Sequence, residues 1–404
     1  MSNSTTTSNF IYGWVQQPNN RGTIDIIRSC IFTIFLCSWT VLCLNIPADD
    51  ERFIHLFTRK ARWMALQIYG PEILLTFPLG QWASARRSVQ EFGRSGYPQW
   101  KSCHAFFADM GGVVLQSPDY PPFPVNAKQV HWLVTEGHMP YPDIDKNLIW
   151  DKNKADTLSR TITIVQTTWF FAQCIGRGCQ GLPLTTFELA TLAFVFCTLP
   201  TFFCWFNKPL DIKTPNFVCI NVPIEGIREK AGPFACQPYI RTPLDFVDPT
   251  ALYWSNHILP KMGLKTGAKR RPIERATNDK VIDAWGTWID GSYIFISFSY
   301  ALIHLAAWNF SFPTDTERHL WRIAVLVMLG CIAYHWLSIY TTEWSKLKST
   351  AAVTSTAMFI GHATAGVAYA IARGYLLVEP LFALRALPAG AFVTVQWSSY
   401  WPHV

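Results

Sequence analysis

Residues 321–340 read WRIAVLVMLGCIAYHWLSIY, an apolar stretch with a single arginine next to its start. An α-helix of about 20 residues is about 30 Å long, which matches the thickness of the hydrocarbon core of a bilayer. Trp321 and Tyr340 stand at the two ends, where amphipathic aromatic rings are favoured at the level of the headgroups. The stretch therefore predicts a membrane-spanning helix.

The composition of the whole chain points the same way. Of 404 residues, 50% are hydrophobic and only 15% are charged, against about 25% charged in an ordinary soluble domain. This excludes a set of soluble domains, a disordered chain and a coiled coil. The net charge of +7 is spread along the chain and interleaved with acids. It therefore favours contact with a lipid bilayer, and we expect no nucleic-acid partner.

Seven stretches are long and apolar enough to cross a bilayer, with ends uncertain by about 2–4 residues. They are Ile24–Asn45, Trp63–Trp82, Thr161–Cys179, Leu189–Phe206, Gly291–Trp308, Trp321–Tyr340 and Val353–Ala372. An eighth, Tyr375–Trp397, is interrupted by two prolines and two charges and is better interpreted as an interfacial or re-entrant segment. The fold class predicted is an all-α polytopic membrane protein with about seven transmembrane helices.

These stretches divide the chain into a series of segments. They are a polar tail (1–23), a transmembrane hairpin (24–82), a long loop with short helices (83–160), a second hairpin (161–206), a long Pro-rich loop (207–290), helices five to seven (291–372) and an interfacial or re-entrant segment (373–404). In the first long loop we expect helices near 104–115 and 127–136. Seven crossings place both long loops on the face of Met1 and the C-terminus on the other face.

Basic residues do not decide the orientation of this topology in the membrane. Arg52, Arg59, Lys60 and Arg62 favour a cytosolic first link, whereas Arg86, Arg87 and Lys208 favour the reverse. The sequons at Asn3 and Asn309 then lie on opposite faces, so that only one of them can carry a glycan. A disulfide among Cys103, Cys219 and Cys236 is expected only if the long loops face an oxidising lumen.

Several motifs resemble those of a large family of fungal multi-pass integral membrane proteins, over nearly the whole chain. They include Asn45-Ile46-Pro47, Gly70-Pro71-Glu72, the stretch from His104 to Gly112 (HAFFADMGG), Gln180-Gly181-Leu182-Pro183 and Asn207-Lys208-Pro209. The resemblance implies a multi-pass membrane fold and brings no activity with it. Relatives that begin with a signal peptide imply an outside N-terminus and, with seven spans, lumenal long loops.

Glu72 is the sharpest candidate for chemistry, because an ionisable group inside a span is costly and tends to be functional. It follows Pro71, which kinks a helix and frees a backbone carbonyl. Removal from water is expected to raise the pKa of this carboxyl and make it a proton donor or relay. The alternative is a structural partner for a base on another span, such as Arg177 or Arg373.

His104 and Asp109 are the other two candidates for catalytic residues. They lie on a short apolar stretch that ends in Gly111-Gly112. A spacing of five does not put both on one helical face, so a direct dyad is not implied, and the stretch fits a helix with a polar end at a cavity mouth. The alternative is a satisfied histidine and an aspartate in a helix-terminal turn.

The remaining charged groups have plain interpretations that we prefer. The first long loop contains an acidic group, Asp143, Asp145, Asp151 and Asp156, and the second contains a basic run at 261–271. The acids lack the repeated spacing of a prenyltransferase, so we expect a solvated acidic surface and a basic patch that meets lipid headgroups. His304, His335 and His362 form no di-iron box and are expected to make core hydrogen bonds. Asp25 and Arg28 are expected to pair locally, Arg177 to reach the interface, and Glu379 and Arg385 to pair only through a kink or a third partner.

No phosphate-binding loop, serine elbow or dinucleotide fingerprint is present. We therefore expect no cofactor and no metal. The function predicted is a membrane-embedded enzyme of fungal specialised or lipid metabolism. It would act on a lipophilic substrate, isoprenoids among the candidates, by acid–base cyclisation or isomerisation, with terpene cyclisation as one example. The alternatives are a small-solute transporter or channel, and a sensory or scaffold protein. The expected location is an endomembrane such as the endoplasmic reticulum, or the plasma membrane.

Overall fold

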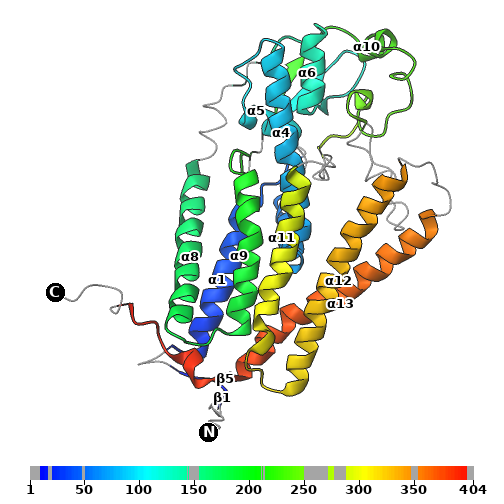
Figure 1. The fold of residues 1–404 in the computed structure, drawn as a ribbon. Coiled ribbons are helices and arrows are strands. Elements are labelled where there is room, and N and C mark those ends of the chain that lie inside the picture. The colour runs from blue at the N-terminus through cyan, green and yellow to red at the C-terminus, as the bar shows by residue number, and fades with distance from the viewer. Residues whose placement is uncertain are drawn as a thin grey trace.

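The computed structural model describes residues 10–16, 21–47, 51–142, 144, 154–210, 212, 214–249, 272–276, 288–346 and 354–397 (Figure 1). Within these ranges the chain is mostly helical. Five helices are long and apolar enough to cross a membrane, namely Thr23–Val41, Thr186–Cys204, Trp288–Asn309, Asp315–Thr341 and Ile360–Arg385. The prediction of a helical protein with several apolar, membrane-length helices is therefore confirmed at this level.

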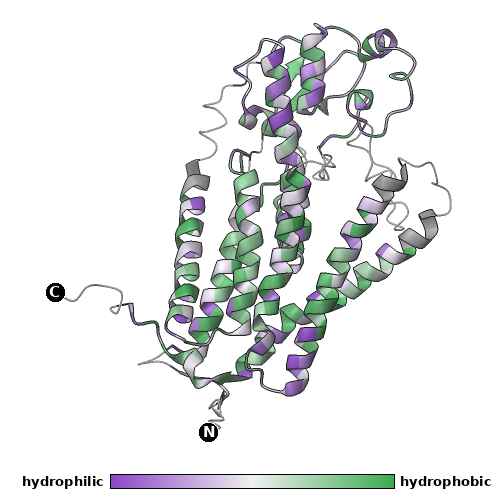
Figure 2. Cartoon of the chain, viewed as in Figure 1, coloured by the Kyte–Doolittle hydropathy of each residue, from purple (hydrophilic) through white to green (hydrophobic). Residues whose placement is uncertain are grey.

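Long helices form an elongated bundle below a smaller helical cap (Figure 1). They are α1 (Thr23–Val41), α8 (Lys154–Cys179), α9 (Thr186–Cys204), α11 (Trp288–Leu305), α12 (Asp315–Lys346) and α13 (Thr354–Phe382). Figure 2 shows that hydrophobic residues dominate the bundle, whereas hydrophilic residues gather in the cap and at the opposite end. The apolar band between two polar ends is what a bilayer requires of a spanning protein.

The predicted span Trp63–Trp82 is wrong, because the chain turns back inside it. Helix α2 (Phe53–Tyr69) ends at Gly70, and α3 (Pro71–Leu74) and α4 (Thr76–Arg94) follow. The rings of Trp63 and Phe77 are in edge contact, with centroids 5.1 Å apart, whereas 14 residues of straight helix would separate them by about 21 Å. The two arms therefore form a hairpin, and α4 continues into the cap (Figure 1).

The cap contains α5 (Ser102–Asp109), α6 (Ala127–Thr135) and α10 (Ile224–Ala231) beside a small sheet of order β3-β2-β4. Strand β2 (Val113–Gln116) pairs antiparallel with β3 (Phe123–Pro124) and parallel with β4 (Asn216–Cys219), which joins the two long loops. The helix expected over 104–115 stops at Asp109. Gly111 there adopts φ 84°, and a Cβ on Gly112 would lie 2.6 Å from the ring of Phe107.

The two described ends of the chain meet at the end of the bundle farthest from the cap. Strand β1 (Phe10–Tyr12) pairs antiparallel with β5 (Ala386–Pro388), and Figure 1 places this pair opposite the cap. The short helices η5 (Ala383–Arg385) and η6 (Ala389–Phe392) flank β5, and α13 continues past Pro380 before it ends. The segment expected to start at Tyr375 is therefore the last part of a long helix followed by this strand.

The described parts of the long loops lie in the cap, at the end of the bundle opposite β1 (Figure 1). The α2–α4 hairpin returns to the end of the bundle from which it started, so that the chain enters the cap at that end. Asn309, at the end of η4 (Ala306–Asn309) between α11 and α12, consequently lies at the same end as β1 (Figure 1). Asn3 and Met1 lie outside the described residues.

Candidate functional site

The break between α2 and α3 leaves helix carbonyls without helical partners in the interior of the bundle. Pro71 has no N–H, and Gly70 closes α2 by donating to the carbonyl of Leu66 over 2.8 Å. The carbonyls of Ile68 and Tyr69 instead accept hydrogen bonds from the guanidinium of Arg373, at 3.2 Å and 2.6 Å. A cation at a helix C-terminus also complements the helix dipole. Arg373 on α13 therefore caps α2.

Arg373 is 1% exposed and makes two further contacts, both with α11. Its Nη1 lies 3.4 Å from Nε2 of His304, and its guanidinium lies 5.1 Å from the centre of the Tyr300 ring. Nδ1 of His304 lies 2.9 Å from the carbonyl oxygen of Tyr300. Because a carbonyl only accepts and a guanidinium only donates, the geometry assigns the proton to Nδ1 and the lone pair to Nε2.

Glu72 lies in the first turn of α3, directly beyond this cap. It is 3% exposed, and neither of its carboxyl oxygens has a hydrogen-bond partner among the described residues. The hydroxyl of Tyr300, which is fully buried, has none there either. Arg373 is close enough to act on Glu72 electrostatically, although the described residues form no direct ion pair between them. Buried polar groups are nearly always hydrogen-bonded. Both oxygens of the Glu72 carboxyl therefore remain available to accept a hydrogen bond from a group other than the described residues.

These four side chains, Glu72, Tyr300, His304 and Arg373, are called here the Glu72 cluster. They come from three separate elements, α3, α11 and α13, and α9 also contacts α3. Removing a carboxyl from water without a hydrogen-bond donor is costly. The cluster therefore combines a carboxyl available for a new contact, a neutral imidazole and a fixed cation.

His104 and Asp109 lie on α5 in the cap, whereas Glu72 lies in the bundle (Figure 1). Nδ1 of His104 accepts from the backbone N–H of Lys101 over 3.0 Å. Asp109 accepts from the N–H of Ala127 and from the hydroxyl of Ser84, at 3.0 Å and 3.2 Å. The contact of His104 caps α5, and the two contacts of Asp109 join α5 to α4 and to the start of α6. The structure does not place them in the Glu72 cluster.

The three histidines predicted inside spans separate into two places. His335 and His362 face each other from α12 and α13 with ring centroids 6.0 Å apart, and Nε2 of His362 lies 2.8 Å from the hydroxyl of Ser338. His304 belongs to the Glu72 cluster. No three His, Cys, Asp or Glu side chains in the described part of the chain are grouped so that they could hold a metal ion.

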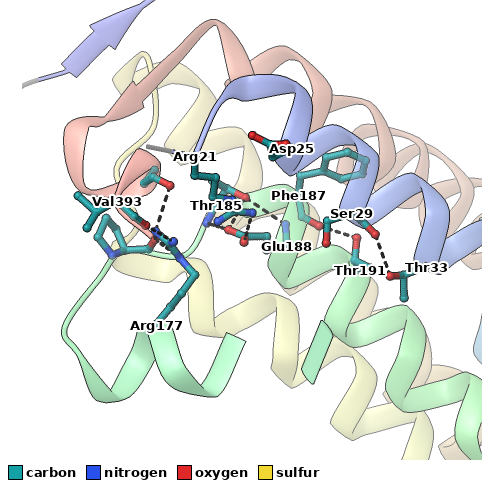
Figure 3. Close-up of polar contacts among 12 residues, drawn as sticks. Arg21, Asp25, Ser29, Thr33, Arg177, Thr185, Phe187, Glu188, Thr191 and Val393 are labelled. Carbon is teal, nitrogen blue, oxygen red and sulfur yellow. Dashed lines mark hydrogen bonds and ion pairs between the residues drawn. The ribbon is translucent and has the colours of Figure 1, made fainter. Parts of the chain in front are cut away.

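A second polar network, at the β1–β5 end, is shown in Figure 3. Arg177 on α8 is buried and donates to the carbonyls of Pro183, Gly390, Ala391 and Val393 over 2.8–3.1 Å. Arg21 pairs with Glu188 at 2.5 Å, and Glu188 also accepts from Thr185. These contacts join α8 to the α8–α9 link and to the C-terminal segment, and they join the segment before α1 to the start of α9. This network therefore fixes the C-terminal segment onto α8 and α9, and Arg177 does not reach towards the interface as expected.

Two further predicted pairs lie near the β1–β5 end. Asp25 accepts from the N–H of Gly22 at the start of α1, over 2.8 Å, and Arg28 is exposed. Arg385 pairs with Glu317 of α12 at 2.5 Å, and no ion pair between Arg385 and Glu379 is present among the described residues. Asp143, Asp145, Asp151 and the basic run lie outside the described residues, as does the side chain of Asp156.

Lys208, which the sequence marks only as a basic residue after an apolar stretch, is buried. It is 1% exposed where α9 meets the cap, and its Nζ donates to Oε1 of Gln81 over 2.8 Å and to Oδ1 of Asn45 over 3.4 Å. Burial lowers its pKa from 10.5 to about 8. A lysine directly after an apolar stretch is normally expected to reach the headgroups, so only its place in the Asn207-Lys208-Pro209 motif hinted at this role.

The comparisons with known proteins show a family but no activity. A family model described as "Family of unknown function (DUF8562)" matches residues 1–226 and 291–404. No curated protein matches the chain, and no solved structure matches it. The matched residues include all four residues of the Glu72 cluster and leave out residues 227–290. The chain belongs to this family of unknown function.

Proposed function

We propose that this protein is a membrane-embedded enzyme that performs acid–base chemistry on a lipophilic substrate, with Glu72 as the group that exchanges the proton. The single observation that carries the proposal is the Glu72 carboxyl, which is buried in the bundle with both oxygens free of hydrogen bonds from described residues. Buried ionisable groups at membrane depth are generally functional, because their cost must be offset.

The other members of the Glu72 cluster have roles that follow from their contacts. Arg373 caps the end of α2 and so positions α3, and His304 contacts Arg373, which makes both of them positioning residues. Tyr300 offers a hydroxyl without a described partner and an aromatic face. Aromatic faces stabilise cations, which suits a substrate that becomes positively charged on protonation. Cyclisation or isomerisation of an isoprenoid in fungal specialised or lipid metabolism is chemistry of this kind.

The proposal includes a membrane topology that is finer than the five apolar helices. We count α8 as a sixth crossing, because its 26 residues lie beside α1 and α9 along the bundle (Figure 1). The α2–α4 hairpin is then a re-entrant element, which is tolerated at membrane depth when protein surrounds its non-helical backbone. The location proposed is an endomembrane or the plasma membrane.

The experiment compares variants of the gene in a producing strain from which the native copy has been deleted. Glu72→Gln keeps the size of the side chain and removes its acid–base function. Glu379→Gln is the matched control, because Glu379 is also a buried carboxyl with an oxygen that lacks a described partner. We expect Glu379→Gln to restore the lipophilic metabolites that the deletion removes and Glu72→Gln to leave them missing. Restoration by Glu72→Gln at normal protein level would refute the proposal.

Transport of a small solute is the second candidate, and the broken helix is the observation that favours it. Transporters place their sites where half-helices end near the middle of the membrane, and α2 and α3 end and begin beside Glu72 and Arg373. Purified protein in liposomes distinguishes the two candidates. Solute flux driven by a pH gradient and lost in Glu72→Gln supports transport, whereas turnover of a lipid without flux supports the enzyme.

A further inference from the structure

The two polar ends of the bundle differ in their lysines. Every lysine side chain that the structure describes belongs to the cap or to its junction with the bundle: Lys60, Lys101, Lys128, Lys208 and Lys230. The sequence has no lysine in 1–59, 155–207, 281–345 or 349–404. Those ranges contain β1, β5 and the links that join α8 to α9 and α11 to α12, which form the other end (Figure 1).

The arginines add to the same asymmetry. Three arginines of the β1–β5 end are paired with acids, namely Arg21 with Glu188, Arg318 with Asp315 and Arg385 with Glu317. At the cap end four arginines close to the bundle are exposed, namely Arg52, Arg62, Arg86 and Arg87, whereas two are exposed near the other end, Arg28 and the paired Arg385. The hairpin brings Arg52 and Arg62 to the same end as Arg86 and Arg87, because Arg59 of α2 donates to the carbonyl of Asn45 and Lys208 joins Asn45 to Gln81 of α4.

We infer that the cap end of the bundle faces the cytosol and that the β1–β5 end, with both described ends of the chain, faces the lumen or the cell exterior. Lysine and arginine near span ends are retained on the cytosolic side, where anionic headgroups attract them. The chain's basic residues gave no clear orientation when seven spans were assumed. With the hairpin re-entrant, the two groups that opposed each other lie on one side.

The N-terminal half of α2 fits the same side of the membrane. Phe53, Ile54 and Phe57 are exposed there beside Arg52. A helix that presents aromatic and aliphatic side chains next to basic ones is typical of elements that lie in the headgroup region of an anionic leaflet. The cytosolic leaflet is the anionic one.

The exposed cysteines of the chain lie at both ends of the bundle. All eleven cysteines of the chain are free thiols, and two of them, Cys219 on β4 and Cys236, are exposed in the cap. The sulfur of Cys219 donates to Oε1 of Gln116 over 3.0 Å. Exposed cysteines persist as thiols in the cytosol, whereas the lumen of the secretory pathway favours disulfides. Because Cys179 is exposed as well, at the β1–β5 end, the thiols do not distinguish the two ends and serve below as reporters of orientation.

This orientation decides from which side of the membrane partners and modifying enzymes reach the protein. A water-soluble partner of the cap must come from the cytosol, and the sequon at Asn309, whose side chain is exposed, lies on the side where glycans are attached. This orientation does not depend on the chemistry of Glu72. It does rest on the proposed insertion in the membrane, which extraction with alkaline carbonate tests separately, since a peripheral protein would be released.

The test uses exposed native cysteines as reporters in the full-length chain. Cys179, at the end of α8, is exposed at the β1–β5 end, whereas Cys219 and Cys236 are exposed in the cap. Three variants each retain one of these cysteines, with the other two and the half-buried Cys103 and Cys331 replaced by serine. Sealed microsomes with their cytosolic face outward are treated with a membrane-impermeant, polyethylene-glycol-linked maleimide, before and after detergent.

We expect the variants that retain Cys219 or Cys236 to gain mass in sealed microsomes, and the variant that retains Cys179 to gain mass only after detergent. Protection of a lumenal marker protein shows that the vesicles are sealed. The inference is overturned if Cys219 and Cys236 react only after detergent, or if Cys179 reacts in vesicles in which the lumenal marker is protected.

Discussion

Arg373→Met is the substitution that tests the architecture of the Glu72 cluster most severely. The methionine side chain is comparable in length but donates no hydrogen bond. Its introduction leaves the carbonyls of Ile68 and Tyr69 buried without the donors that they have at 3.2 Å and 2.6 Å. It also removes the contact of Arg373 with Nε2 of His304.

The magnitude follows from these contacts. Each orphaned buried acceptor costs about 1–3 kcal/mol, so two carbonyls give about 2–6 kcal/mol. Relief from burying the cation offsets part of this cost. We therefore expect Arg373→Met to lower the free energy of unfolding by about 3–4 kcal/mol. Unfolding of the purified protein by dodecyl sulfate in mixed micelles, followed by tryptophan fluorescence, measures it.

Arg322→Met is the matched control. Arg322 also serves a helix-end carbonyl, that of Trp308, at 3.0 Å and 2.8 Å, but it is only half-buried and serves one acceptor. Its loss should cost about 1 kcal/mol. A cost for Arg373→Met no larger than that for Arg322→Met would refute the reasoning that Arg373 caps the broken helix.

Three further substitutions test other parts of the structure. Because burial lowers the pKa of Lys208 to about 8 from 10.5, the unfolded chain binds more protons than the folded chain between these pH values. The stability of the native protein relative to Lys208→Met should therefore rise from pH 8 to pH 10.5, by up to about 3 kcal/mol in micelle unfolding, and a flat difference would count against it. Gly112→Ala should destabilise by about 1–3 kcal/mol, because its Cβ would lie 2.6 Å from the Phe107 ring. Gly226→Ala, which meets nothing within 4 Å, should be neutral or stabilising; equal effects would contradict the packing described. Arg177→Gln should speed amide hydrogen exchange in β5 and η6, because it weakens four contacts with carbonyls of the C-terminal segment and of the α8–α9 link. Arg28→Gln, at an exposed arginine, should leave this exchange unchanged. Unchanged exchange in Arg177→Gln would show that pairing with β1 alone holds the segment.

Local hydrophobicity was enough to predict where most of the bundle helices lie. The expected stretches at Ile24–Asn45, Leu189–Phe206 and Trp321–Tyr340 each overlap a helix long and apolar enough to cross a membrane. Hydropathy averaged over a window does not record the direction of the chain, however. The window around Gly70 contains enough apolar residues for a span, although Gly70 and Pro71 reverse the chain there.

The candidate site was predicted in part, because the cost of a charge inside the membrane is visible in sequence whereas its partners are not. Glu72 was identified in this way, and Arg373 was one of two bases considered for it. The cap of α2 by Arg373 joins residues about 300 positions apart, and no local pattern reports such a contact. His104 and Asp109 were drawn into the site by an apolar helix that packs in the cap core instead.

The central claim is that Glu72 exchanges a proton with a lipophilic substrate. The most direct measurement incubates membranes that contain the protein, in heavy water, with the lipophilic compound that accumulates in the deletion strain. We expect native membranes to form a product that carries solvent deuterium, and membranes with Glu72→Gln at equal protein level to form none. Conversion by Glu72→Gln at the native rate, or a product without solvent deuterium, would contradict the claim.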